Sequence, residues 1–301
     1  MMILAAVDLS SASVDAARTA LALARHLGDE LVLVHAVEPL PGVTSAAPVS
    51  PGQPPDHHVH AANLDALKNL RTSLMADDVG VELRVVEGRP YDALMACAAQ
   101  CKPRLLVMGS HGRAAVARLL LGSVTQKIVL ASPCPVLVMR EGTAPFATWN
   151  QRPLRVTAGI DRAETGAAIM NWLRPLRAAG PTEVTLLHEF WPAREQARRA
   201  RLAPESANSP ESAAHSDEAD VARLLEQELR NQLRAQGVAD DYNLRACPVQ
   251  GPVSEQLGID ARAEAADLLV IVNAHVQASG WGSVTAATMS ATRVPLLVLP
   301  V

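Results

Sequence analysis

Several features that would mark other protein classes are scarce in this sequence. Aromatic residues make up only 3% of the 301 residues, and there are four cysteines. No stretch approaches the roughly 20 consecutive apolar residues that a membrane-spanning helix needs. The net charge of −4 gives no reason to expect nucleic acid as the main partner. We therefore expect a protein that binds neither membranes nor nucleic acid.

The N-terminal residues and the cysteines predict a cytoplasmic protein. The apolar N-terminus lacks a basic n-region and meets Asp8 too early for a signal peptide. Four cysteines without a disulfide-like framework are typical of a reducing compartment. Hydrophobic residues reach 49% with few aromatics, so the core must be built from Ala, Val and Leu. Such a core suits parallel strands covered by Ala-rich helices.

One stretch, from residue 105 to residue 140, contains the most informative pattern. A short apolar run, Leu105 to Met108, predicts a buried strand. It is followed by Gly109 and Gly112 and, after nine more residues, by Gly122-Ser123. Glycines can adopt positive φ and place no Cβ between backbone amides and a bulky anion. A glycine-serine turn at a helix start adds free N–H groups and the positive end of the helix dipole. The pattern predicts a phosphate-binding site.

Two common phosphate-binding motifs are absent. No Gly-Lys-Ser/Thr occurs, which excludes a Walker A loop, and the three closely spaced glycines of the dinucleotide fingerprint are missing. The spacing Gly109-x2-Gly112-x9-Gly122-Ser123, followed by Pro-Val-Leu-Val, instead resembles the ATP-binding signature of the universal stress protein family. A loop that needs glycines only for tight turns is the alternative.

The resemblance implies a set of nucleotide-binding residues. In this family an Asp at the end of the first strand lies near the ribose and phosphates, and Asp8 matches that position. A plain helix-preceding cap is the alternative for Asp8. The backbone at Ala6, Val7 and Ala36 would line the adenine pocket. The residues expected at ATP and Mg²⁺ around the signature are Met108, Gly109, His111, Gly112, Arg113, Gly122, Ser123, Val124 and Thr125.

Strands and helices alternate through the first half. The near-continuous apolar run at Glu30–Val37 predicts a strand that is covered on both faces. Further strands are predicted at Met2–Val7 and Val81–Val86, with helical spacing of apolar residues between the strands. This alternation predicts a doubly wound parallel α/β sheet. The resemblance implies five strands in the order 3-2-1-4-5. Ligands of such sheets lie outside the carboxyl ends of the strands at the switch in strand order, where Asp8 and Gly109 are expected.

The second half repeats the first. A strand ending at Asp161 is followed 27 residues later by His188, the spacing that separates Asp8 from His35 (188 − 161 and 35 − 8). Both halves also contain Gly-Ser-Val-Thr, beginning at residues 122 and 282. We therefore predict two tandem domains of one Rossmann-like fold, 1–142 and 152–301, joined by a linker within residues 141–153.

The two halves differ where phosphate would bind. Val272 aligns with Gly109 and His275 with Gly112, and the loop to the next glycine is three residues shorter (122 − 109 is 13; 282 − 272 is 10). A β-branched residue disfavours positive φ, and its side chain would crowd a phosphate. We therefore predict a degenerate second domain that keeps the fold, with Asp161 as a structural remnant.

An insertion of ten residues also distinguishes the second half. It falls within residues 192–217, which begin with several arginines, Arg194, Arg198, Arg199 and Arg201, and continue with a Ser/Pro/Glu-rich tract. We interpret the segment as a flexible loop. An arginine cluster for an anionic partner is the alternative.

Other candidate sites carry weaker signals. Cys97 and Cys101 lie four residues apart on one predicted helix. We interpret them as small buried packing residues, and a metal or redox pair is the alternative. Three histidines, His57, His58 and His60, fall in a Pro- and Gly-rich stretch that we interpret as a solvated loop without metal-ligand partners. His111 lies inside the glycine loop, but no second residue supports a role as general base.

The expected function is that of a nucleotide-responsive stress protein that binds ATP in its N-terminal domain only. ATP would change how the chain meets an unknown protein partner. The alternative is an enzyme of the same architecture that slowly hydrolyses ATP or transfers a group from it. We also predict that the two domains form an intrachain pseudo-dimer through their last strands, Pro135–Met139 and Pro295–Leu299. Two chains could associate further.

Overall fold

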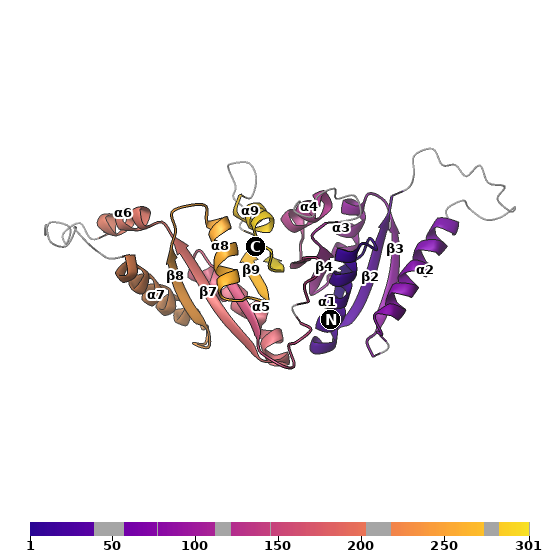
Figure 1. Ribbon diagram of the computed structural model, residues 1–301, viewed down its shortest axis with the longest axis horizontal. Helices are drawn as coiled ribbons and strands as arrows, with labels where there is room; N and C mark the ends of the chain where they lie inside the picture. Colours follow the sequence, from indigo (N-terminus) through magenta and orange to yellow (C-terminus); the bar gives the residue numbers. More distant parts are fainter. Residues whose placement is uncertain are drawn as a thin grey trace. The chain divides into compact units, whose positions relative to one another are not determined.

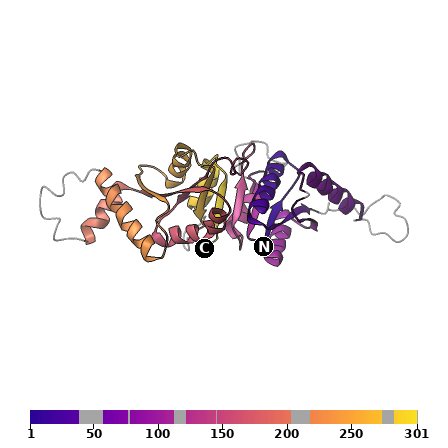
Figure 2. The same cartoon turned by 90° about the horizontal axis from the view of Figure 1, so that it is seen from below.

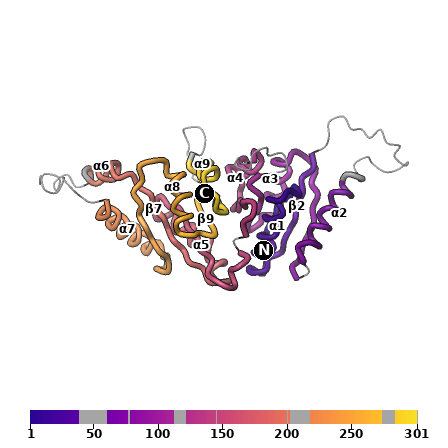
Figure 3. Tube along the Cα trace, viewed as in Figure 1, coloured from indigo at the N-terminus to yellow at the C-terminus, as the bar shows by residue number. Residues whose placement is uncertain are grey.

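The computed structural model describes residues 1–38, 57–76, 78–111, 122–144, 146–202, 218–273 and 283–300. The chain forms two compact units, unit 1 with Met1–Ala147 and unit 2 with Thr148–Leu299. Each unit alternates strands and helices along the chain (Figures 1 and 3). Among the described residues, no helix is both long enough and apolar enough to cross a membrane.

Unit 1 contains a parallel sheet in the order β3-β2-β1-β4-β5. This is the strand order that the resemblance implied. Its elements are β1 (Met2–Ala6), α1 (Ser11–Leu27), β2 (Glu30–Val37), α2 (His57–Ser73), β3 (Val81–Glu87), α3 (Pro90–Cys101), β4 (Leu105–Gly109), α4 (Ser123–Ala131) and β5 (Val136–Met139).

Unit 2 repeats this arrangement in the order β8-β7-β6-β9-β10. Its elements are β6 (Leu154–Gly159), α5 (Ala163–Ala179), β7 (Thr182–Phe190), α6 (Pro192–Leu202), α7 (Glu218–Ala235), β8 (Asn243–Pro248), α8 (Val253–Ala263), β9 (Leu268–Val272), α9 (Ser283–Ala291) and β10 (Leu296–Leu299). In each unit the helices lie on both faces of the sheet (Figure 2). The doubly wound α/β class predicted from the alternating pattern is thereby confirmed.

The first helix of the chain begins and ends at the residues that the sequence indicates. Ser10 is the N-cap of α1, and its hydroxyl oxygen accepts a hydrogen bond from the N–H of Ser13. Gly28 is the C-cap with φ 64°, in the left-handed region that glycine adopts without steric cost. The small residues between them, including Ala12, Ala16 and Ala20, are fully buried. They allow α1 to pack closely on the sheet.

The histidines of the internal repeat connect neighbouring strands. His35 Nδ1 lies 2.6 Å from Val7 O, and His188 Nδ1 lies 3.1 Å from Ile160 O. Because a carbonyl oxygen only accepts, each Nδ1 carries the proton and each Nε2 is left as an acceptor. The repeated spacing therefore reflects a side chain on β2 or β7 that fixes the chain just after β1 or β6.

Two segments differ from the sequence expectations. Pro192–Leu202 is helix α6 and not a flexible loop, since Glu195 pairs with both Arg198 and Arg199 along it. The rest of that insertion, 203–217, lies outside the described residues. The histidine stretch belongs to the start of α2, which begins earlier than its apolar spacing suggested.

The linker region is attached to unit 2. Trp149 is fully buried and donates from Nε1 to Pro181 O at 2.8 Å. A Cβ at Gly180 would lie 2.9 Å from the Trp149 ring, so this glycine makes room for the indole. The residues at the linker's end thus form part of the unit 2 core.

Candidate functional site

The predicted site of unit 1 lies where β1 and β4 end side by side. The two strands are parallel neighbours, with Ala6 opposite Met108. Ala6, Val7 and Met108 are buried, whereas Ala36 near the end of β2 is partly exposed. Asp8 and Ser110 therefore leave the sheet at the same edge. Gly112 and Arg113, also expected at the site, lie outside the described residues.

Asp8 organises the turn between β1 and α1. Its Oδ1 accepts from the backbone N–H of Ser10 at 3.1 Å and from the Ser10 hydroxyl at 2.6 Å. Between them, Leu9 has φ 65°, a left-handed conformation that costs a residue with a Cβ on the order of 1 kcal/mol. Such strain is concentrated at ligand-binding turns. Asp8 is therefore not the cap itself but the residue that holds the cap, Ser10.

Gly109 is needed for a different reason than expected. Its φ is not positive, because it continues the extended backbone of β4. A Cβ at this position would instead lie 3.0 Å from the carbonyl carbon of Ala12 and 3.1 Å from its Cβ. The glycine therefore lets the first turn of α1 approach the end of β4, which brings Ser10 and Asp8 to the site.

We predict that Gly109→Ala destabilises unit 1 by about 1–3 kcal/mol, because backbone atoms of α1 must move to relieve the contact. The matched control is Gly122→Ala, where the added Cβ meets nothing closer than 3.4 Å. Urea unfolding followed by circular dichroism compares the two variants. Equal midpoints for both would show that the Ala12 contact has no structural importance.

The start of α4 has backbone donors that pair with no other group among the described residues. Gly122 is its N-cap, with φ −63° and ψ 139° and no side-chain capping bond. The Gly122 N–H donates to Ser110 O at 2.8 Å, which fixes the helix start beside β4. The N–H groups of the first turn, from Ser123 to Thr125, have no intrahelical carbonyl partner, and the helix dipole is positive there. This end of α4 can therefore bind an anion.

The hydroxyl groups near α4 have separate roles. Thr125 is buried, and its Oγ1 donates to Gly109 O at 2.9 Å. The Thr125 hydroxyl proton therefore holds α4 against β4. The sequence had suggested that this hydroxyl would donate to a phosphate. Ser123, by contrast, is exposed at the helix start, and Val124 is partly exposed.

His111 has two partners that the sequence did not reveal. Its Nδ1 lies 3.0 Å from Ser110 Oγ, and its Nε2 lies 3.6 Å from Glu141 Oε2. Glu141 also accepts from the Ser11 hydroxyl at 2.8 Å. Glu141 follows β5 and is thirty residues away in sequence, so no local spacing could have identified it. The contacts position His111 between α1 and the end of β5.

The donor set at this edge of unit 1 suits a hard cation only in part. Asp8 offers a carboxylate oxygen, the ligand type that Mg²⁺ prefers, but Mg²⁺ normally takes most of its ligands from phosphates and water. Among the described residues there is no group of three or more His, Cys, Asp or Glu side chains that could hold a metal ion. A magnesium ion here would need a bound phosphate to complete its coordination.

The cysteine pair of unit 1 lies away from this edge. Cys97 and Cys101 on α3 have sulfur atoms 3.9 Å apart, and Arg84 of β3 lies 2.7 Å from Cys101 Sγ. Cys97 is buried, and burial raises the pKa of its thiol. The pair packs α3 against β3.

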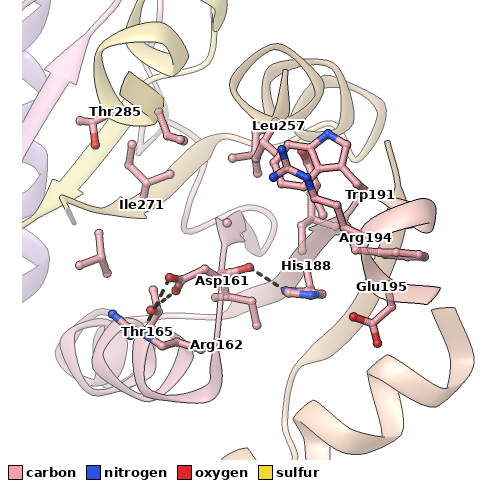
Figure 4. Close-up of a pocket in the computed structure, with 18 of the residues that line it drawn as sticks. Asp161, Arg162, Thr165, His188, Trp191, Arg194, Glu195, Leu257, Ile271 and Thr285 are labelled. Carbon is pink, nitrogen blue, oxygen red and sulfur yellow. Dashed lines mark hydrogen bonds and ion pairs between the residues drawn. The ribbon is translucent and has the colours of Figure 1, made fainter. Parts of the chain in front are cut away.

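Unit 2 has a cavity of about 610 Å³ at the corresponding edge (Figure 4). It is lined by the ends of β6, β7 and β9 and by the starts of α6, α8 and α9. Asp161, the counterpart of Asp8, accepts from the Thr165 hydroxyl and lies 3.8 Å from Arg162 Nε. The volume is within the usual range for small-molecule sites, about 300–1,000 Å³. The structure thus places a ligand-sized space in the half that the sequence described as degenerate.

In unit 2 a valine replaces the glycine that ends β4 in unit 1, and this valine acts through its side chain. Val272 occupies the Gly109 position, since it pairs with Leu299 as Gly109 pairs with Met139. Its backbone is extended, so the expected conflict with positive φ does not arise. Because β9 has a side chain here, α5 cannot approach it as α1 approaches β4. Val272 and Thr165 of α5 both line the cavity. His275 lies outside the described residues.

Two ionisable groups in the cavity wall have shifted pKa values. Burial lowers the pKa of His188, so its ring is neutral near pH 7. Glu189 follows it in β7, and burial together with the charge of Asp260 raises the pKa of its carboxyl group to about 8. Both Glu189 carboxyl oxygens are buried and have no hydrogen-bond partner in the described part of the chain. The sequence signal for this group is a glutamate near the carboxyl end of the mostly apolar strand β7, and sequence analysis missed it.

The comparisons with known proteins agree with this architecture. A model of the universal stress protein family matches residues 1–140. The universal stress protein in the QAH/OAS sulfhydrylase 3′ region of Thermus aquaticus is 37% identical over 141 residues, 46% of this chain and 97% of that protein. The chain belongs to the universal stress protein family. Universal stress protein MJ0531 of Methanocaldococcus jannaschii is 30% identical over 136 residues, 44% of this chain and 78% of its own length.

Solved structures extend the likeness to both halves of this universal stress protein. A universal stress protein from Archaeoglobus fulgidus superposes with a TM-score of 0.65 at 15% identity, over 99% of this chain and 98% of that one. The functionally unknown protein PA1789 from Pseudomonas aeruginosa gives 0.60 at 15% identity, over 99% and 92%. At this level of identity the matches show the fold alone. They establish a tandem arrangement of two universal stress protein folds.

Proposed function

We propose that unit 1 binds ATP together with Mg²⁺ and that the bound nucleotide changes how the protein meets a protein partner. The observation that carries the proposal is the start of α4, where Gly122 leaves the first-turn N–H groups uncapped beside the end of β4. These groups would hold phosphate oxygens. Asp8, two residues beyond β1, would face the ribose or the metal ion. Family membership and the glycine spacing of residues 109–123 support the same assignment.

The alternative, slow ATP hydrolysis, receives less support from the geometry. The Nδ1 atom of His111 lies within hydrogen-bond distance of the Ser110 hydroxyl oxygen, at 3.0 Å. Its Nε2 faces the Glu141 carboxylate at 3.6 Å, which is too long for a hydrogen bond. A general base must be aligned with the attacking water, and these contacts align the His111 ring with protein groups instead. We assign His111 a positioning role in nucleotide binding.

The proposal predicts that Gly122→Val abolishes ATP binding, by at least about 100-fold, and preserves the fold. The backbone at Gly122 suits valine, since its φ and ψ are extended, and a Cβ there makes only ordinary contacts. The added methyl groups would occupy the space in front of the first-turn N–H groups. Calorimetric titration of nucleotide-free protein with ATP and Mg²⁺ measures the effect.

Gly251→Val is the matched control for this test. Nothing lies within 4 Å of a Cβ at Gly251 in unit 2, so the same substitution there should leave ATP affinity unchanged. If folded Gly122→Val protein bound ATP as tightly as the parent, the α4 start would not be the phosphate site.

Two other expectations stay predictions. One is that the last strands of the two units pair with each other, and the other is that two chains associate further. The identity of the protein partner and its response to nucleotide are likewise open to experiment.

A further inference from the structure

We propose that the cavity of unit 2 binds a small monocarboxylic acid with an apolar body, whose carboxylate is held by Arg194. The proposal concerns a second ligand, chemically distinct from the nucleotide of unit 1. It rests on the walls of the cavity, on the pairing of the charged groups around it, and on the position of Arg194.

The body of the ligand would contact mainly apolar side chains. Val253 and Leu257 of α8 line the cavity together with Ile271 and Val272 of β9. Val284 of α9 adds a further apolar side chain and is 47% exposed, so it stands at the opening. Burial of apolar ligand surface against such walls supplies most of the affinity in small-molecule sites.

The cations around the cavity are not equally available. Arg198 pairs with Glu195 at 2.8 Å and with Glu228 at 3.1 Å, which connects α6 to α7. Arg162 lies 3.8 Å from Asp161. In the part of the chain that the structure describes, Arg194 pairs with no carboxylate. A ligand can therefore gain one ion pair at Arg194 without breaking another.

Arg194 is held in place by an aromatic ring. Its guanidinium carbon lies 4.5 Å from the centre of the Trp191 ring, within the range of a cation–π contact. The Trp191 indole is itself fixed, because its Nε1–H donates to Gly251 O at 3.2 Å. Figure 4 shows Trp191 and Arg194 together on one side of the cavity and Asp161, Arg162 and Thr165 on another. The guanidinium is thus a prepositioned donor to a carboxylate.

The same charges disfavour a polyphosphate. A triphosphate brings three or four negative charges. Among the described residues, the cavity offers one guanidinium without a carboxylate partner, that of Arg194, and the nearby carboxylate of Asp161. The Val272 side chain also occupies the position where unit 1 has a glycine. One negative charge on an apolar body matches this environment better. His188 Nε2, left as an acceptor, can add a hydrogen bond to a donor group on the ligand.

The test is calorimetric titration of the full chain with three acids, 4-phenylbutyrate, indole-3-propionate and octanoate, each beside its neutral primary amide. We expect at least one acid to bind with a dissociation constant below about 1 mM and about tenfold more tightly than its amide. Arg194→Gln should remove this preference and leave amide binding within twofold. Val284→Trp, at a half-exposed position, should block the opening and weaken acid and amide alike by at least tenfold.

Arg223→Gln is the matched control, because Arg223 on α7 is exposed, pairs only with Asp220 in the described structure, and does not line the cavity. The proposal is overturned if no acid binds below about 1 mM, if acid and amide bind equally, or if Arg194→Gln keeps the preference. Saturating ATP should not compete with the acid, and Gly122→Val should not affect it. Failure of the parent protein to bind ATP, with acid binding intact, would count against the proposed function only. Displacement of the acid by ATP would overturn the present proposal, because it would place the nucleotide in this cavity.

Discussion

Replacing Glu189 with glutamine is expected to stabilise unit 2 by several kcal/mol at pH 8 and to leave it almost unchanged at pH 4. The Glu189 carboxyl lies in β7 with both oxygens buried and unbonded. Burial, and secondarily the charge of Asp260 on α8, raise its pKa from 4.5 to about 8. Across the strand its register partner is Cys247 of β8, a thiol whose pKa burial also raises. Among the described residues no cation pairs with this carboxyl group, so the folded protein keeps it protonated near neutral pH.

The sign of the effect follows from proton linkage. The unfolded chain loses this proton near pH 4.5, whereas the folded chain keeps it up to about pH 8. The folded state therefore binds more protons within this window, and the stability of unit 2 falls as the pH rises through it. The full shift corresponds to a difference on the order of 3–5 kcal/mol. Glutamine has nearly the same shape but does not ionise, so the stability of the variant does not fall with pH for this reason.

The measurement can be made on unit 2 alone because of where the tryptophans lie. All four, Trp149, Trp172, Trp191 and Trp281, belong to unit 2. Urea unfolding followed by tryptophan fluorescence at pH 4, 6 and 8 therefore reports the stability of that unit. His188, whose pKa is lowered by burial, is present in both proteins, so its contribution cancels in their difference.

Glu183→Gln provides the control for the pH series. Glu183 is on the same strand, its side chain is 59% exposed, and its ion pair with Arg155 is at the surface. Surface pairs of this kind contribute little, about 0–1 kcal/mol. A stability gain for Glu189→Gln that did not grow between pH 4 and pH 8 would mean that this carboxyl is ionised in the folded protein.

Most of each sheet could be predicted from the sequence because the strands other than β3 and β8 are buried on both faces. A nearly continuous apolar run such as Glu30–Val37 predicts a buried strand, and strand β2 has the same bounds. The paired spacing of Asp and His revealed the repeat, since a strand and the residue that ends it must keep their register in both copies. Periodicity, capping and repetition are local properties that a sequence displays directly.

The details of the sites could not be predicted because they depend on contacts between distant segments. Gly109 matters through Ala12, and His111 through Glu141; neither partner lies within the same motif. The cavity of unit 2 exists because α6, α8 and β9 leave a space between their side chains. Helix α6 itself carried signals that were overlooked: proline at its first position and glutamate three and four residues before arginines.

The second large effect expected is a stoichiometry of one ATP per chain. Unit 1 presents the uncapped start of α4 next to a strand end without a side chain, Gly109. Unit 2 has Val272 at that place, and its cavity has one unpaired guanidinium among the described residues, Arg194. Losing two or three charge-assisted hydrogen bonds of about 1.5–3 kcal/mol each would weaken a micromolar site at least 100-fold. The second half would then bind ATP too weakly to be detected.

Calorimetric titration of nucleotide-free protein with ATP and Mg²⁺ should therefore give one binding event per chain. Gly122→Val should remove that event, and the equivalent change in the second half, Gly282→Val, should leave it intact. The two variants form a matched pair, because the glycines begin the same Gly-Ser-Val-Thr sequence. A value near two, with one event lost in each variant, would show that the side chain of Val272 does not exclude phosphate. One binding event that is lost only in Gly282→Val would assign the nucleotide to unit 2. Unit 2, and not unit 1, would then be the ATP-binding half.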